Sequence, residues 1–359
     1  MSRKDKDNER TGISFISVLL SLLILALIVG FLVFKHYYNM METHKAVKEK
    51  ENVLENIPKE LPSVDDLYSD DSEDIKADAK EENKDGVNAP DFSFDMDMDG
   101  IRNVLIVGVD TREDDYSGRS DAMILLSVDR KTKKILMTSL LRDIYVSIPD
   151  NGHNRLNAAY AFGGTELLKD TVYENFGIPI DNTIVINFFV IKDFVDAVGG
   201  LDVELSADEI VHMNSYVTTQ SEDFGDGATK DRLPEEDGVY HLNGNQALAY
   251  ARVRYVGTDF GRTARQRTIL TMSLDKVKDM SLKELNDLAE SVLPKLRTDM
   301  DEMDCLSFIL SLALARGYDS ESMAIPVEGM YTFETIDGMS IINVDFEQNT
   351  AKWYNNLTK

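Results

Sequence analysis

The chain has 359 residues, a net charge of −26 and one cysteine, Cys305. A single cysteine excludes an internal disulfide, and with it the class of small disulfide-stapled secreted modules. The acidic balance and the lack of a broad basic face argue against a nucleic-acid-binding protein, so we expect no nucleic-acid partner.

Residues 13–34 are the first recognisable element, a run of 22 residues without a charge. As a helix this run is about 33 Å long, which is enough to cross a bilayer. The ten residues before it contain four lysines and arginines, and the ten after it contain one. This bias predicts a cytoplasmic tail at 1–12, an uncleaved single-pass anchor at 13–34 in the cell membrane, and an extracytoplasmic remainder.

The composition changes after the anchor. Residues 60–99 hold 15 acidic residues against 3 lysines, a pattern typical of an extended, disordered spacer. From Ile101 onward, apolar residues and glycines alternate with polar stretches over about 260 residues, which is enough for one domain with a hydrophobic core. We therefore predict an acidic linker at 35–99 and an extracytoplasmic domain at 100–359.

Three apolar runs predict buried strands at Asn103–Val109, Ala122–Val128 and Ile135–Leu141. The short connection between the last two indicates that the three strands form a meander. In a meander the first strand ends, the second begins and the third ends at the same edge of the sheet. This geometry predicts that four charged residues meet at that edge: Asp110, Arg119, Asp121 and Arg142.

Helix-like and strand-like segments alternate farther along the chain, which indicates the α/β class. The predicted helices are Thr165–Asn175 and Phe189–Val198, and the predicted strands are Thr183–Phe188 and Leu201–Leu205. Met213–Asp237 is polar and contains glycine, and it predicts a long loop.

An arginine cluster at residues 252–267 has a local net charge of +4. Its members are Arg252, Arg254, Arg262, Arg265 and Arg267, with the single acid Asp259. Arginine suits forked contacts with phosphate oxygens, and a helix predicted over Thr263–Val277 would place several of these residues at a helix start, where anions are favoured. Arg262 and Gln266 share a face of that helix. The alternative is that the arginines form ordinary surface ion pairs.

Three aspartates have candidate chemical roles. Asp110 and Asp121 suit Mg²⁺, which takes one or two carboxylates and fills its other positions with waters and phosphate oxygens. The alternative is that both cap loops at strand ends. Asp259 should stay ionised among the arginines, and it either accepts a proton from a hydroxyl or balances their charge. The histidines lack metal-ligand spacing, and no Walker loop, serine-nucleophile elbow or dinucleotide fingerprint is present.

Several blocks occur in an order that is characteristic of one protein family. They read NVLIVGVD at 103–110, GRSD at 118–121, SLLRD at 139–143, LNAAY at 156–160, LNG at 242–244, ALAYARVR at 247–254 and DFGRTARQ at 259–266. Together they resemble the LytR-CpsA-Psr family, membrane-anchored glycopolymer ligases of bacterial envelopes, over roughly residues 100–300. Arg155 stands where the family more often has lysine, and it keeps the charge.

The resemblance implies a fold and a reaction. The fold is a twisted mixed β-sheet between helices, an α/β/α arrangement with an apolar channel for a prenyl tail. The reaction transfers a teichoic-acid-like or capsular glycopolymer, as its sugar phosphate, from a polyprenyl pyrophosphate carrier to a peptidoglycan sugar hydroxyl. Mg²⁺ is the implied cofactor.

The resemblance also implies residue roles. Asp110 and Asp121 would hold Mg²⁺ on the pyrophosphate, while Asp259 would act as the base and Arg262 would stabilise developing charge. The remaining pyrophosphate-binding residues would be Arg119, Arg142, Arg252, Arg254 and Gln266.

Two alternatives remain open from the sequence. One is a polyprenyl-pyrophosphate hydrolase, which uses water as the acceptor. The other is a non-catalytic envelope regulator that binds lipid pyrophosphate and uses the acidic linker to contact a partner.

Overall fold

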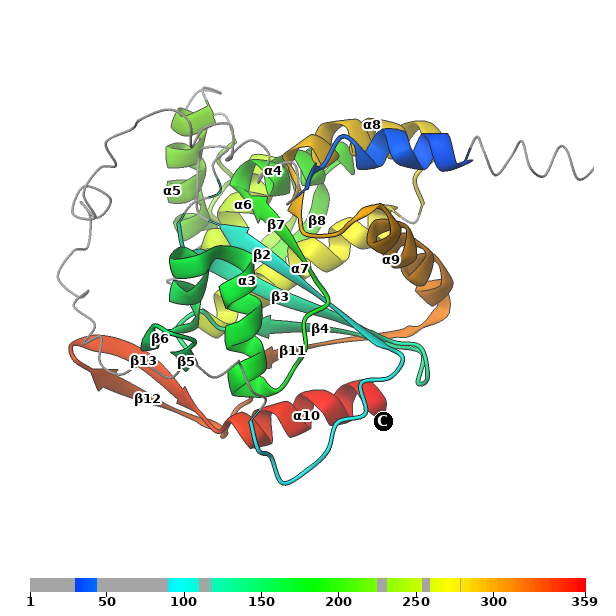
Figure 1. Cartoon of the computed structure of the whole chain (residues 1–359). Coiled ribbons are helices and arrows are strands. Elements are labelled where there is room, and N and C mark those ends of the chain that lie inside the picture. The colour runs from blue at the N-terminus through cyan, green and yellow to red at the C-terminus, as the bar shows by residue number, and fades with distance from the viewer. Residues whose placement is uncertain are drawn as a thin grey trace, which may run out of the picture.

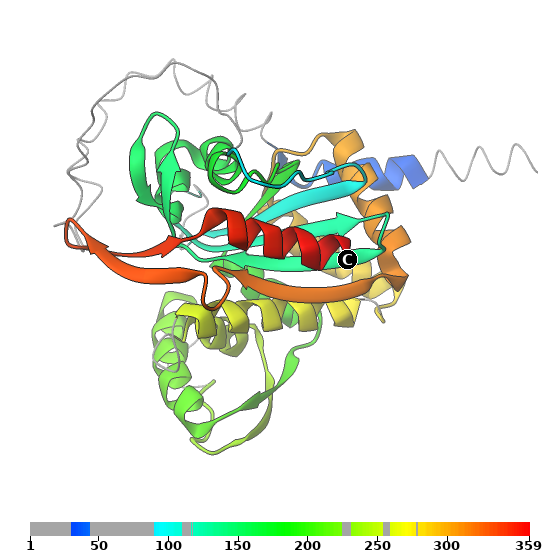
Figure 2. The same ribbon diagram turned by 90° about the horizontal axis from the view of Figure 1, so that it is seen from below.

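A seven-stranded sheet forms the centre of the molecule, with helices on both faces (Figure 1, Figure 2). The structure, a computed structural model, describes residues 30–43, 90–109, 116, 118–224, 231–253, 259–277 and 279–359. The mixed sheet between helices confirms the predicted fold class. Most of the predicted anchor and linker lie outside the described residues, and no helix within those residues has the length and apolar character to span a bilayer.

The sheet has the strand order β1-β10-β7-β2-β3-β4-β11. Its antiparallel centre confirms the predicted meander, since β2 pairs with β3 and β3 pairs with β4. The neighbours β7 and β11 run parallel to β2 and β4. The strands are β1 Glu42–Thr43, β2 Ile101–Val109, β3 Ser120–Asp129, β4 Lys134–Leu140, β7 Asn182–Asn187, β10 Arg297–Thr298 and β11 Asp319–Ile325.

The central strands are apolar on both faces because both faces are covered. Side chains alternate in direction along a strand, so Leu105 and Val107 of β2 join the core on one face. Ile106 and Gly108 of the same strand line a cavity on the other face. The unbroken apolar run of the sequence is therefore shared between a packed core and a cavity.

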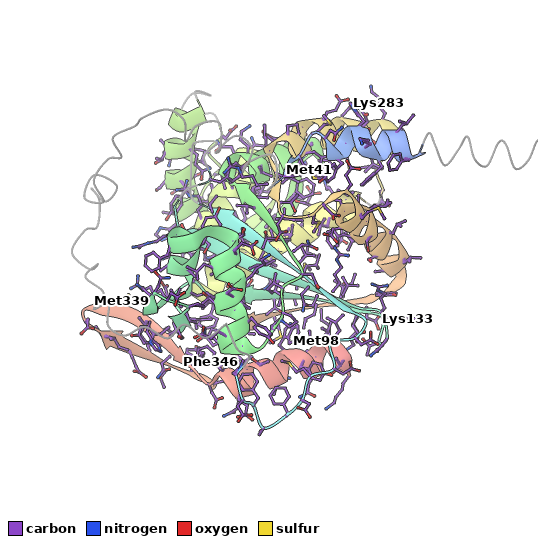
Figure 3. All side chains as sticks on the ribbon, in the orientation of Figure 1. Met41, Met98, Lys133, Lys283, Met339 and Phe346 are labelled. Atoms are coloured by element: carbon purple, nitrogen blue, oxygen red, sulfur yellow. The ribbon has the colours of Figure 1, made fainter. Side chains whose placement is uncertain are left out.

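Two helices cover the first face, α3 (Leu156–Phe176) and α10 (Phe346–Thr358). Phe346, at the start of α10, meets Phe176 with ring centroids 5.0 Å apart (Figure 3). The predicted helix Thr165–Asn175 lies within α3, which begins earlier and kinks at Gly163–Gly164.

A group of helices lies on the second face, and α7 of this group contacts β3 and β4 directly. These helices are α4 Phe188–Ala197, α6 Gly244–Arg252, α7 Asp259–Val277 and α8 Leu282–Val292. Helices α4 and α6 approach closely at Gly244, where an added Cβ would lie 2.1 Å from the Lys192 carbonyl oxygen. Glycine is required there because any side chain would collide with the backbone of α4.

The predicted loop Met213–Asp237 is wrong over its first half. Helix α5 spans Ala207–Phe224 and buries Ile210, Met213 and Val217 on one stripe. Three apolar residues at helical spacing are enough to anchor this helix against the second core, although the residues around them are polar.

The remaining elements form the ends of the molecule. The predicted strand Leu201–Leu205 is confirmed as β8, but it pairs with β9 outside the central sheet. The other elements are β5 Tyr145–Ile148, β6 Gly152–Arg155, β9 Gly238–Leu242, η2 Leu293–Lys295, α9 Glu302–Leu314, η3 Ala315–Gly317, β12 Tyr331–Ile336 and β13 Met339–Val344.

Candidate functional site

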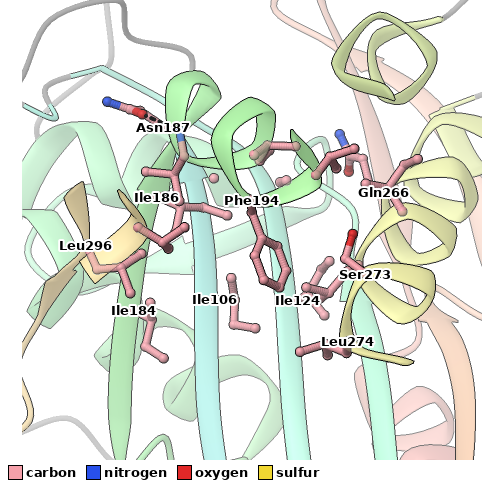
Figure 4. A pocket seen from close by; sticks show the side chains of 18 of the residues that line it. Ile106, Ile124, Ile184, Ile186, Asn187, Phe194, Gln266, Ser273, Leu274 and Leu296 are labelled. Atoms are coloured by element: carbon pink, nitrogen blue, oxygen red, sulfur yellow. Dashed lines mark hydrogen bonds between the residues drawn. The ribbon is translucent and has the colours of Figure 1, made fainter. Parts of the chain in front are cut away.

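An apolar cavity of about 610 Å³ lies between the second face of the sheet and helices α4, α6, α7 and α8. Isoleucines from β2, β3 and β7 form its floor, and Phe194 of α4 points into it (Figure 4). The helical wall is also mainly aliphatic, with Leu248, Ile269, Leu270, Leu285, Leu288 and Val292. A cavity of this size and lining suits a slender hydrocarbon chain.

Polar side chains gather at one end of this cavity. Asn187 and Gln266 lie at that end, and Ile184 and Leu274 lie at the other (Figure 4). The charged residues in the described lining are Asp121 and Arg252. Asp121 stands near the start of β3, where β2 and β7 end, so the polar end is the strand edge predicted from the meander. We call it the mouth of the cavity.

Asp121 and Arg142 form an ion pair at the mouth. Arg142 Nη1 donates to Asp121 Oδ1 at 2.6 Å, and both side chains are about one-fifth exposed, at 20% and 19%. Asp143 extends the network, since its two carboxylate oxygens lie 3.6 Å from Arg142 Nε and 3.5 Å from Arg155 Nε. This contact confirms that the meander brings Asp121 and Arg142 together. Arg119 is exposed just before β3, and Asp110 lies outside the described residues.

Arg252 and Arg262 stand on two different helices. Arg252 ends α6, donates from Nη1 to Gln220 Oε1 at 3.3 Å and lies over the Tyr216 ring at 5.5 Å. Both partners belong to α5, so part of the segment predicted as a loop positions an arginine that lines the cavity. Arg262 is only 3% exposed and shares a face of α7 with the cavity-lining Gln266.

Arg265 and Arg267 have structural contacts. Arg265 Nη2 donates to the Val253 carbonyl oxygen at 2.7 Å, and its Nη1 lies 3.4 Å from Glu209 Oε1. Arg267 Nη1 donates to Ser139 Oγ of β4 at 2.7 Å. The arginines of the cluster therefore fall into two groups. Arg265 and Arg267 join helices and strands to one another, whereas Arg252 lines the cavity.

The helix that carries the cluster begins earlier than predicted. Helix α7 starts at Asp259 rather than Thr263, so Arg262 lies in its first turn while Gln266 and Arg267 lie beyond it. The helix dipole acts within the first turn, so of these residues Arg262 alone lies where the dipole favours a bound anion. The side chain of Asp259 and all of Arg254 lie outside the described residues.

Asn187 is a site residue that the sequence did not reveal. It ends β7 and caps α4, with its Oδ1 accepting from Val190 N at 3.2 Å. It pairs in register with Val109, the last residue of β2, which places it at the mouth. An asparagine between a strand-like and a helix-like run predicts a helix cap. The sequence does not show whether the capping residue also lines a cavity.

A magnesium site remains a prediction. Across the described ranges, no three or more His, Cys, Asp or Glu side chains gather in a metal-binding arrangement. The mouth nevertheless suits the ion, because Mg²⁺ needs only one or two carboxylates when phosphate oxygens supply other ligands, and Asp121 is accessible there.

Comparison with known proteins gives the family. The LytR_cpsA_psr family model matches residues 65–358. The Bacillus subtilis polyisoprenyl-teichoic acid–peptidoglycan teichoic acid transferase TagT is 31% identical over 245 residues, 65% of this chain and 72% of TagT. The TagU transferase of Halalkalibacterium halodurans is 34% identical over 243 residues, 67% of this chain and 74% of TagU.

Solved structures agree with this assignment. TagT bound to LIIa-WTA has a TM-score of 0.56 at 25% identity, covering 74% of this chain and 92% of that chain. A Streptococcus agalactiae protein, gbs0355, has a TM-score of 0.58 at 27% identity, covering 72% of this chain and 86% of that one. The resemblance inferred from the ordered sequence blocks is thereby confirmed, and the chain belongs to the LytR-CpsA-Psr family.

Proposed function

We propose that this protein is a membrane-anchored, extracytoplasmic phosphotransferase that moves a glycopolymer from a polyprenyl pyrophosphate carrier to a sugar hydroxyl of peptidoglycan. The observation that carries the proposal is the apolar cavity with charged residues at its mouth. A carrier lipid has the matching pattern, a long hydrocarbon chain that ends in a pyrophosphate. The names of TagT and TagU support a teichoic-acid-like polymer as the donor.

The arginines supply the pyrophosphate site in this proposal. Arg142 pairs with Asp121 at the mouth, Arg252 and Gln266 line the cavity, and Arg262 lies one turn before Gln266 on α7. Arg119 lies two residues before Asp121 and Arg254 lies two residues after Arg252, and both would join the site. Guanidinium groups bind phosphate oxygens in forked pairs and stabilise the charge that develops on them during transfer.

Asp259 acts as the general base in the proposed reaction. It accepts the proton of the acceptor hydroxyl, whose oxygen forms a bond to the phosphorus that carries the sugar. The bond from that phosphorus to the bridging oxygen breaks, and the electron pair leaves on polyprenyl phosphate. Arg262, in the first turn of the same helix, stabilises this charge.

Mg²⁺ would be held by Asp121 of β3 and by Asp110, which follows the last residue of β2 in sequence. When bound, the ion neutralises charge on the pyrophosphate oxygens. Removal of Mg²⁺ with a chelator is expected to weaken donor binding as well as slow transfer, and Asp121→Asn is expected to raise the Mg²⁺ concentration needed for both.

The test uses the full-length protein in detergent with lipid-linked donor, peptidoglycan and Mg²⁺. Asp259→Asn should lower the rate of polymer attachment by about 10²–10⁴-fold, the usual worth of a general base. Asp202→Asn is the matched control, because Asp202 is an exposed β8 aspartate paired with His241 at 2.7 Å. An Asp259→Asn protein that works as well as wild type would contradict the mechanism.

The same assay separates the two alternatives. Hydrolysis is the activity if polyprenyl phosphate appears at the same rate without peptidoglycan. A regulator is indicated if Arg252→Ala abolishes donor binding while Asp259→Ala leaves cellular function intact.

A further inference from the structure

Helix α9 carries a row of apolar side chains that are exposed on its outer side. The relative exposures are 68% for Met303, 53% for Leu310 and 76% for Leu314. These positions are seven and four residues apart, so they form one stripe along the helix. Cys305 and Phe308 face the opposite way and pack on Val104 of β2. The helix is therefore seated on the sheet by one side and apolar on its outer side.

The cavity reaches the surface beside this helix. Leu274 of α7 and Ile309 of α9 both line the cavity, yet they are 40% and 52% exposed. Leu274 lies at the end away from the mouth, two turns of α7 beyond Gln266 (Figure 4). We call this second opening the rear opening. A cavity of about 610 Å³ is of drug-ligand size, so a long prenyl chain seated in it would project from the rear opening.

The chain that leads from the predicted anchor is docked against the same region. Residues 30–38 are helical and lie beside α8 and α9 (Figure 1). Tyr37 Oη donates to Asn286 Oδ1 at 2.5 Å, and Tyr38 Oη donates to the Met300 carbonyl oxygen at 3.3 Å. Phe34 and Tyr38 pack on the α9 core, and β1 pairs with β10 immediately afterwards.

This docking decides where the anchor emerges from the domain. Phe31, Leu32 and Val33 are 49%, 59% and 49% exposed, and they belong to the uncharged run 13–34. A bilayer that holds this run would therefore lie next to α9. A second copy of the chain would have to find the same surface by diffusion, whereas the bilayer is brought there by the chain itself.

We propose that the outer row of α9, Met303, Leu310 and Leu314, lies in the interfacial layer of the bilayer, and that a carrier tail passes between bilayer and cavity at the rear opening. Helices with one apolar side bind membranes in this orientation. Tyr37 and Tyr38 lie three and four residues after the uncharged run, and tyrosines favour the membrane interface. The passage of a tail rests on the proposed function, but the membrane contact of α9 does not.

The membrane contact can be tested by fluorescence quenching. Full-length protein carrying Cys305→Ala and one new cysteine is labelled with a fluorophore and reconstituted in phosphatidylcholine–phosphatidylglycerol vesicles with or without nitroxide-labelled lipid. The labels at Leu310→Cys and Leu314→Cys are expected to be quenched at least threefold more than one at Val239→Cys, an equally exposed control on β9 at 70%. Equal quenching at the three positions overturns the proposal. The proposal is also overturned if the α9 labels become shielded from water as the protein concentration rises, with no dependence on lipid. That result would indicate contact with a second copy of the chain.

The passage of the tail is tested separately with Leu310→Lys/Leu314→Lys in the full-length chain. This variant should transfer polymer at least tenfold more slowly from a donor embedded in vesicles and at the wild-type rate from a detergent-dispersed donor. Equal loss with both donors would overturn the role of α9 in tail passage. If the wild-type protein transfers nothing from either donor, the proposed function has failed, and the quenching experiment still decides the membrane contact.

Discussion

Replacement of Arg265 should cost stability, whereas replacement of Arg252 should cost donor binding. The two residues come from one positive stretch of sequence, but their surroundings differ. Arg265 is 7% exposed and contacts the Val253 carbonyl oxygen and Glu209. Burial, reinforced by the Glu209 carboxylate, also raises the pKa of Tyr250, whose ring lies 5.9 Å from the Arg265 guanidinium. Arg252 has a 3.3 Å hydrogen bond and stands at the mouth.

The size of the effect follows from the burial of the ion pair. Removal of one partner from a buried pair costs about 3–5 kcal/mol, and the lower end applies because the Glu209 side chain is 18% exposed. A loss of about 3 kcal/mol corresponds to a fall in Tm of about 6–12 °C for a domain near this size. Arg252→Ala removes the hydrogen bond to Gln220 and the contact with the Tyr216 ring, which together are worth about 1–2 kcal/mol and a smaller shift in Tm than that of Arg265→Ala.

Thermal unfolding and donor binding are measured on both variants of the full-length protein. Adding Glu209→Gln to Arg265→Ala should recover part of the lost stability, because the uncompensated carboxylate is then removed. The reasoning is refuted if Arg265→Ala unfolds at the wild-type temperature while losing donor affinity, since Arg265 would then be a ligand-binding residue.

Three further predictions concern the elements around the cavity. Gly244→Ala should lower the free energy of unfolding by about 1–3 kcal/mol because its Cβ meets the Lys192 carbonyl, while Gly317→Ala, with no atom within 4 Å, should be neutral in the same denaturation assay. Ser273→Ala should raise Tm, because the Ser273 hydroxyl is fully buried in the cavity wall and has no hydrogen-bond partner among the described residues. Burial raises the pKa of Cys305 from 9.0 to about 11, so its thiol ionises more readily in the unfolded chain. Wild type should therefore lose up to about 3 kcal/mol relative to Cys305→Ala as the pH rises from 9 to 11 and show no such loss below pH 9, as measured by denaturant unfolding.

The central sheet could be predicted because its strands carry a strong local signal. The first three strands are short apolar runs separated by turn-forming residues, and their boundaries agree with β2, β3 and β4 to within two residues. The contact between Asp121 and Arg142 then followed from topology alone. Helix α5 was missed because its apolar stripe is only three residues long, and its stability depends on a second core that forms from distant segments.

The cavity could not be predicted from residue types. Ile106 and Val107 are consecutive apolar residues of one strand, yet one lines empty space and the other is packed in the core. The difference arises from how far α4 and α8 stand from the sheet, and no local property of the strand encodes that distance. Residue pattern likewise could not separate Arg252 from Arg265, because both are arginines of one cluster. Contacts with distant parts of the chain distinguish them, such as that of Arg265 with Glu209 of α5.

The two openings of the cavity give the positions of the docked residues 30–38 and of the mouth a common explanation. The mouth lies at the strand edge with Asp121 and Arg142, and the rear opening lies beside α9, where residues 30–38 are docked. A carrier lipid in a bilayer presents its pyrophosphate to water and keeps its tail in the membrane. A tail that fills the cavity and projects from the rear opening has its pyrophosphate at the arginines and its far end in lipid. In the proposed arrangement, the docking of residues 30–38 on α8 and α9 orients the rear opening toward the donor.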